Sequence, residues 1–300
     1  LDANADVAED LAYVSTALEA MPAAWVFETM DVVVAGSTGS PLVRPVAMPP
    51  LRSMGSMQAL LPADLLGTTF EWDEVEAAYV ATARAGAPAN GIRFILYDRM
   101  DVPPAENGFV DLTDDSDPSA DRLGVHLEKD GVTRLDYDIE VVETTTGGTV
   151  GVTGYLTDGI DRVDFDLVES VAQTTDGFRI DVDYTLSLAG EPLSVDLDYT
   201  IDFGTTIGAS LVATFENGAN TLVLAMSQDG EAALEGTVEW NGDLVMTIAD
   251  DGTGEPVFLG PEGEELSAAE AQAIREMFEV ATDGLDFLAA YVVLLGGGIA

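Results

Sequence analysis

The chain has 300 residues, of which 11 are Lys or Arg and 55 are Asp or Glu, so its formal net charge is −44. Phosphate backbones and anionic lipid surfaces bind through clustered cations, so we expect no nucleic-acid partner and no acidic-membrane partner. Hydrophobic residues make up 47% of the chain, which is enough for an apolar core and unlike a disordered acidic segment. The absence of cysteine removes disulfides, thiolate metal sites and cysteine nucleophiles.

Residues 1–62 are expected to hold a helix, a strand and a Pro/Gly-rich arm. Apolar residues recur at helical spacing before Pro22 (Val7, Leu11, Val14, Leu18). Residues 25–35 are rich in β-branched and aromatic side chains and predict a strand. Residues 36–50 contain four prolines and should form a long surface arm able to reach a neighbouring molecule.

A period-two alternation of apolar and polar residues begins at residue 68 and predicts antiparallel β structure through residue 249. Later strands are separated by tight-turn sequences such as Asn217-Gly218 and Asn241-Gly242, so consecutive strands should be antiparallel neighbours. Parallel pairing would need helical crossovers that this region lacks. Fourteen strands are expected, at residues 68–72, 77–83, 91–97, 109–112, 123–128, 132–143, 149–156, 162–171, 177–188, 193–203, 206–216, 221–227, 232–240 and 244–249.

The C-terminal segment predicts a long helix. It opens with a capping box, Ser267 and Glu270, and continues with apolar residues at helical spacing up to Leu295. The expected fold is therefore mainly β: a large curved antiparallel meander at 63–260, with the N-terminal segment 1–62 and the C-terminal helix 261–300 packed on one face, in one continuous domain.

Four predicted strands share an Asp-X-Asp pattern. Alternation places every Asp of the pattern on the solvent face, so strands that pair in order would line that face with a ladder of carboxylates. The ladder residues are Asp136, Asp138, Asp164, Asp166, Asp181, Asp183, Asp196 and Asp198. Like charges opposite each other destabilise a sheet, so the presence of this ladder requires an explanation. One explanation is solubility in a salty exterior. The other is binding of hard divalent cations such as Ca²⁺.

A second acidic cluster lies in a predicted loop before the long strands. It comprises Asp114, Asp115, Asp117 and Asp121, which are candidate Ca²⁺ ligands but lack the EF-hand spacing and its central glycine. No other cofactor is indicated by the sequence.

Catalytic motifs are not recognisable. The chain has one histidine, His126, inside a predicted strand, where a hydrogen-bonded role is commoner than a catalytic one. With 55 acidic residues in the chain, pairs of carboxylates are expected by chance and do not indicate a glycosidase. We therefore expect a protein that is not an enzyme and has no catalytic residues.

Residues 65–98 (LLGTTFEWDEVEAAYVATARAGAPANGIRFILYD) and 106–116 (ENGFVDLTDDS) resemble a pattern in uncharacterised exported lipoproteins of high-GC bacteria. The resemblance covers roughly residues 60–130 and implies export, with no assigned activity. The expected layout, a meander with helices on one face, is also similar to the lipoprotein-carrier half-barrels, which hold acyl chains between sheet and helices; this second likeness is one of fold only.

Export is also suggested by the start of the chain at Leu1, without a basic or apolar leader, as in a mature product. No stretch of 18 apolar residues is present, so we expect no membrane-spanning segment. The leading expectation is a periplasmic or surface protein that assembles with itself or with other subunits, as a filament, surface-layer or membrane-extrinsic subunit. The alternative is a periplasmic carrier of a lipid or another apolar ligand between sheet and helix.

Overall fold

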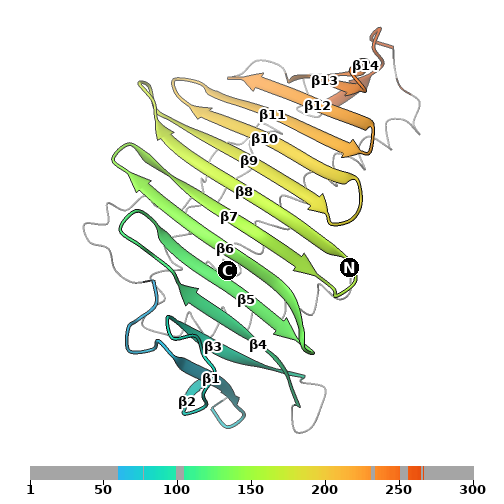
Figure 1. The fold of residues 1–300 in the computed structure, drawn as a ribbon. Helices are drawn as coiled ribbons and strands as arrows, with labels where there is room; N and C mark the ends of the chain where they lie inside the picture. The colour runs from blue at the N-terminus through green and yellow to red at the C-terminus, as the bar shows by residue number, and fades with distance from the viewer. Residues whose placement is uncertain are drawn as a thin grey trace.

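The computed structural model describes residues 60–76, 78–98, 105–230, 234–250, 256–264 and 266. These residues form one open sheet of fifteen strands in the order β15-β14-β13-β12-β11-β10-β9-β8-β7-β6-β5-β4-β3-β1-β2 (Figure 1). The strands are β1 (Thr68–Asp73), β2 (Ala78–Thr82), β3 (Gly91–Asp98), β4 (Ala105–Asp114), β5 (Asp121–Lys129), β6 (Val132–Thr144), β7 (Gly147–Thr157), β8 (Arg162–Gln173), β9 (Phe178–Leu188), β10 (Leu193–Phe203), β11 (Ile207–Asn217), β12 (Asn220–Asp229), β13 (Glu235–Trp240), β14 (Asp243–Asp250) and β15 (Pro256–Leu259).

The antiparallel meander expected from the sequence is confirmed from β3 to β15, where every strand pairs with its neighbours in the chain. All fourteen predicted strands are present, and β15 is an additional short one. The predicted helices at 7–18 and 267–295, the strand at 25–35 and the arm at 36–50 lie outside the described residues.

The expectation of antiparallel pairing throughout is wrong at one place, because β1 and β3 are parallel, with Thr68 opposite Ile92. The chain forms the β1–β2 hairpin first, and residues 83–90 then return it across β1. A short strand with its loop thus acts as the crossover, which we had expected to require a helix.

Tight turns fix the register of the hairpins. Asp130-Gly131 and Asn241-Gly242 have positive φ at both residues, as two-residue hairpin turns that follow strand twist require. From β5 onward most neighbouring strands are therefore held in an uninterrupted register, with irregularities only near Leu127 and Val238 among the described pairs from β5 to β15.

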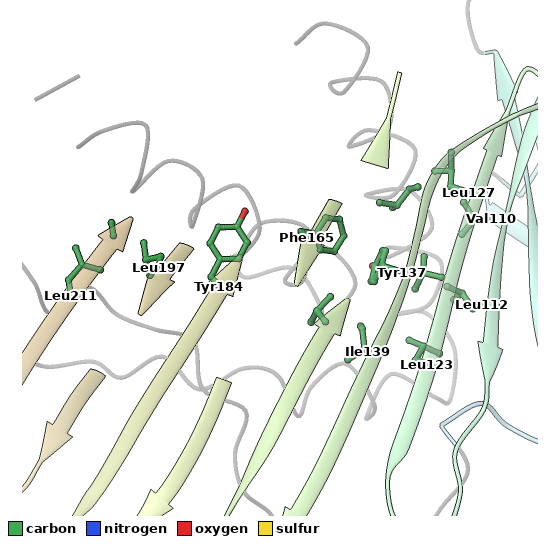
Figure 2. Close-up of a cluster of buried hydrophobic side chains, with 14 of the residues drawn as sticks. Val110, Leu112, Leu123, Leu127, Tyr137, Ile139, Phe165, Tyr184, Leu197 and Leu211 are labelled. Atoms are coloured by element: carbon green, nitrogen blue, oxygen red, sulfur yellow. The ribbon is translucent and has the colours of Figure 1, made fainter. Parts of the chain in front are cut away.

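The two faces of the sheet differ completely in character. One face carries apolar side chains that lie opposite one another on neighbouring strands, for example Tyr184 opposite Leu197 and Leu197 opposite Ala213. Figure 2 shows Tyr184, Leu197 and the other labelled apolar side chains rising from one side of neighbouring strands. This apolar face is buried from Phe70 in β1 to Phe258 in β15. We call the opposite side, which carries the Asp-X-Asp residues, the acidic face.

Candidate functional site

On the acidic face the carboxylates are staggered, which differs from the continuous ladder that we had expected. β6 and β8 are separated by β7, so their Asp residues do not face each other. Asp166 lies opposite Thr153 and Thr185, and Asp196 lies opposite Thr185 and Thr214. Asp136, Asp138 and Asp164 face other residue types in the same way: Asp136 lies opposite His126 and Tyr155, Asp138 opposite Gly124 and Thr153, and Asp164 opposite Tyr155 and Ser187.

Threonine hydroxyls serve two of these carboxylates. The Thr153 hydroxyl donates to Asp166 Oδ2 at 2.9 Å, and the Thr200 hydroxyl donates to Asp181 Oδ1 at 2.8 Å. Each hydroxyl supplies a donor where a second carboxylate would have repelled. At these positions of the acidic face, hydroxyl groups therefore separate the solvated carboxylates of neighbouring strands.

One pair of ladder residues does meet directly, Asp183 and Asp198 on β9 and β10. Burial raises the pKa of Asp183, and a hydrogen bond with Asp198 and the charges of Asp198 and Asp181 raise it further. Because two carboxylates side by side resist double ionisation, this pair retains a proton more readily than an isolated Asp.

The loop cluster of the sequence analysis does not converge on a common centre. Asp117 accepts hydrogen bonds from Ser119 and from the Arg122 guanidinium, and Asp115 accepts them from the Asn90 amide and the Thr113 hydroxyl. The remaining members also have local roles: Asp114 accepts from the backbone N–H of Ser116, and the pKa of Asp121 is raised by burial and by the charge of Asp114. Among the described residues, no group of three or more His, Asp or Glu is arranged to hold a metal ion.

The single histidine belongs to a polar row across β3, β4, β5 and β6. Arg93 forms a bidentate ion pair with Asp111, with both N–O distances 2.6 Å, and its guanidinium stacks 3.7 Å over the Phe109 ring. His126 lies opposite Asp111, and its Nδ1 is 3.4 Å from Asp136 Oδ2. The row is held by ion pairing and stacking.

The apolar face holds a feature that the sequence analysis missed. Three buried polar atoms there have no hydrogen-bond partner among the described residues: the hydroxyls of Tyr137 and Tyr184 and the Oε1 of Glu169. The two tyrosines are 4% and 3% exposed, and the Tyr184 hydroxyl points away from the sheet (Figure 2). Burial raises the pKa of Glu169 to about 7 and raises the pKa of both tyrosines.

Strand register places two of these atoms close together. Glu169 lies opposite Val182, and Tyr184 is two residues further along the same strand. Diagonal neighbours of this kind have backbones roughly 7–8 Å apart, within reach of long side chains. The alternation of residues in β8 predicts that Glu169 lies on the apolar face, because Phe165, Leu167 and Glu169 fall on one side of the strand.

Comparison of the chain with protein-family models, with curated proteins and with solved structures finds no match. The part of the chain that the structure describes also contains no helix long and apolar enough to cross a membrane.

Proposed function

We propose that the protein is a non-enzymatic extracytoplasmic carrier, which holds an apolar ligand with one polar end against the apolar face of the sheet. The observation that carries this proposal is the set of unpartnered polar atoms of Tyr137, Tyr184 and Glu169 on that face.

Leaving those polar atoms without hydrogen-bond partners destabilises the folded protein. A buried polar atom without a hydrogen bond destabilises a protein by about 1–3 kcal/mol, whereas Phe in place of Tyr would fill nearly the same volume at no such cost. Phe165 already occupies such a position beside Tyr137, with ring centroids 6.2 Å apart. Polar atoms retained among Phe and Leu are accounted for by a ligand whose head group bonds to them and whose tail lies along the apolar rows.

The proposal includes the helices expected from the sequence. A single sheet needs a cover for an apolar face, and the proposal assigns that role to the two terminal segments, which have amphipathic sequences. The ligand would lie between that cover and the sheet, as in the half-barrel carriers to which the expected layout is similar.

Two measurements test the carrier proposal. Mass spectrometry of a solvent extract of protein purified from its source should reveal a stoichiometric amphiphile. Calorimetric titration of the delipidated protein with dodecanoic acid, dodecanol and dodecylamine should show saturable binding of at least one probe, weakened about tenfold by Tyr184→Phe, the loss of one hydrogen bond. Tyr155→Phe is the matched control, because Tyr155 lies on the acidic face beneath Arg162. An empty extract together with no binding of any probe would refute the proposal.

The alternative proposal is the assembly role that the sequence analysis put first. Its filament form depends on sheet edges that accept a strand from a neighbour. Here the edge strands β2 and β15 have five and four residues, and β15 begins with Pro256, which has no N–H to donate. Short edges of this kind discourage strand addition, so we place the carrier proposal first. Multimers in native mass spectrometry of the delipidated protein would reverse that order.

A further inference from the structure

Exposed apolar side chains gather at one end of the sheet. The odd-numbered strands from β1 to β13 all end there, at the right of Figure 1, and the described turns at this end lead into the even-numbered strands. Among the described residues nine large apolar side chains are exposed, and six of them lie in or beside these turns. We call these six the tip residues: Val75, Val132, Ile160, Leu193, Trp240 and Leu244.

The opposite end of the sheet differs. Its described turns carry one exposed large apolar side chain, Ile207, which is 37% exposed. Single exposed apolar residues are normal on any protein. Their concentration at one of two chemically similar ends is what needs an explanation.

Two tip residues lie in turns that are held by the same pattern of hydrogen bonds. Asp73 Oδ1 accepts the backbone N–H groups of Val75 and Glu76, at 2.8 and 3.0 Å. Asp158 Oδ1 accepts those of Ile160 and Asp161, at 2.8 and 2.9 Å.

In both turns the apolar residue stands two positions after the Asp, and the side chains of Val75 and Ile160 are 91% and 90% exposed. These hydrogen bonds hold the turn that carries each side chain, and Asp turns of this type are stable local structures. The apolar tips therefore protrude from ordered turns.

The spacing of the tips favours a fluid apolar phase over a protein groove. At about 4.8 Å per strand, the β1–β2 and β7–β8 turns are roughly 30 Å apart and the β13–β14 turn is roughly another 30 Å along the sheet. Val132 and Leu193, at the β5–β6 and β9–β10 turns, stand roughly 10 Å to either side of Ile160, so the tips form a single row along this end of the sheet. A protein interface needs a contiguous buried centre, whereas tips in a row can each enter the interfacial region of a bilayer independently. Trp240, which lies opposite Asp243 at the β13–β14 turn, is a residue type that favours that region.

The charges beside the tips define the lipid. Val75 stands between Glu74 and Glu76, and Ile160 stands beside Asp161 and two residues after Asp158. The cations near Ile160 are Arg134 and Arg162, but acidic residues outnumber basic ones over the turns that carry the tip residues. Anionic headgroups would repel these carboxylates, while zwitterionic headgroups would not. We propose that this end of the sheet docks on a bilayer of zwitterionic lipid, with the tip residues entering the headgroup region. This docking is independent of the carrier proposal, since it involves none of Tyr137, Tyr184 and Glu169.

The test is vesicle flotation of the full chain with pure phosphatidylcholine vesicles. The double variant Val75→Ser/Ile160→Ser should bind at least about tenfold more weakly, because two almost fully exposed apolar side chains are lost. Ile207→Ser, at the other end, should bind like the unmodified protein. Replacing a third of the lipid by phosphatidylserine should weaken binding at low salt.

Several results would overturn the proposal. They are no binding of the unmodified protein to phosphatidylcholine, equal binding of the double variant, or tighter binding to the anionic vesicles. Tip-dependent binding to source membranes but not to pure lipid would assign this end to a protein partner instead. Ligand titration of the double variant separates the two proposals, since its cargo binding should be unchanged.

Discussion

Glu169 provides the sharpest test of the structure, because a carboxyl among apolar side chains makes stability depend on pH. Its pKa is raised from an ordinary 4.5 to about 7 by burial. Below pH 4.5 the carboxyl is protonated in both the folded and the unfolded chain, so it has no effect. As pH rises above 4.5 the unfolded chain ionises first, and stability falls until the folded carboxyl also ionises near pH 7.

The magnitude follows from the two pKa values. Linkage gives a destabilisation of about 0.8 kcal/mol at pH 5 and about 3.3 kcal/mol at pH 8. We expect Glu169→Gln to remove this dependence, so the difference in unfolding free energy between variant and unmodified protein should grow by about 2.5 kcal/mol from pH 5 to pH 8.

Urea unfolding followed by circular dichroism, at constant ionic strength and at pH 5, 6, 7 and 8, measures this difference directly. Glu216→Gln is the control, since Glu216 is exposed on the acidic face and shares any general effect of the negative charge. A Glu169→Gln difference that stays constant across this range would show that the carboxyl is solvated, and the buried position of Glu169 would be wrong.

Three further outcomes are expected. Arg93→Ala should cost about 3 kcal/mol in urea unfolding because it leaves Asp111, which is 8% exposed, without its bidentate partner, whereas Arg179→Ala at an exposed pair should cost less than about 1 kcal/mol. Asp183→Asn should stabilise the protein by about 0.5 kcal/mol at neutral pH and have no effect in acid, because the raised pKa of Asp183 makes the paired carboxylates unfavourable only as pH rises through it; a gain that persists in acid would contradict this. Calcium chloride and sodium chloride at matched ionic strength should give the same melting temperature, and a rise specific to calcium would mean that Asp114 and its neighbours, or the acidic face, bind the ion.

The strands were predictable because two independent signals agree. Period-two alternation gives the strand interiors, and sequences such as Asn241-Gly242 give the ends of the hairpins. β15 was missed because four residues are too few to show an alternation. The parallel pairing of β1 with β3 was missed for another reason: residues 83–90 form a loop too long to fix strand order, so local pattern specified the strands but not their neighbours.

The candidate site was predictable only in part. The position of Glu169 on the apolar face follows from alternation, but its lack of a partner depends on everything packed around it. The repetition of the Asp-X-Asp pattern predicts which residues lie on the acidic face. Which residues lie opposite them depends on the strand register, and the sequence pattern alone leaves the register undetermined in steps of two residues.

That two-residue ambiguity gives the Asp-X-Asp pattern a structural use. In the observed register of β8 and β9, Asp166 lies opposite Thr185 and Asp164 lies opposite Ser187. A slip of two residues in one direction would keep every apolar side chain on the apolar face, but it would bring Asp166 opposite Asp183. Repulsion between like charges directly opposite each other disfavours that slip, while the observed register lets hydroxyls face carboxylates. Hydrophobic patterning thus selects the face of each strand, and between β8 and β9 the carboxylates disfavour one of the registers that hydrophobic patterning leaves equal, whereas between β9 and β10 the observed register accepts the Asp183–Asp198 pair.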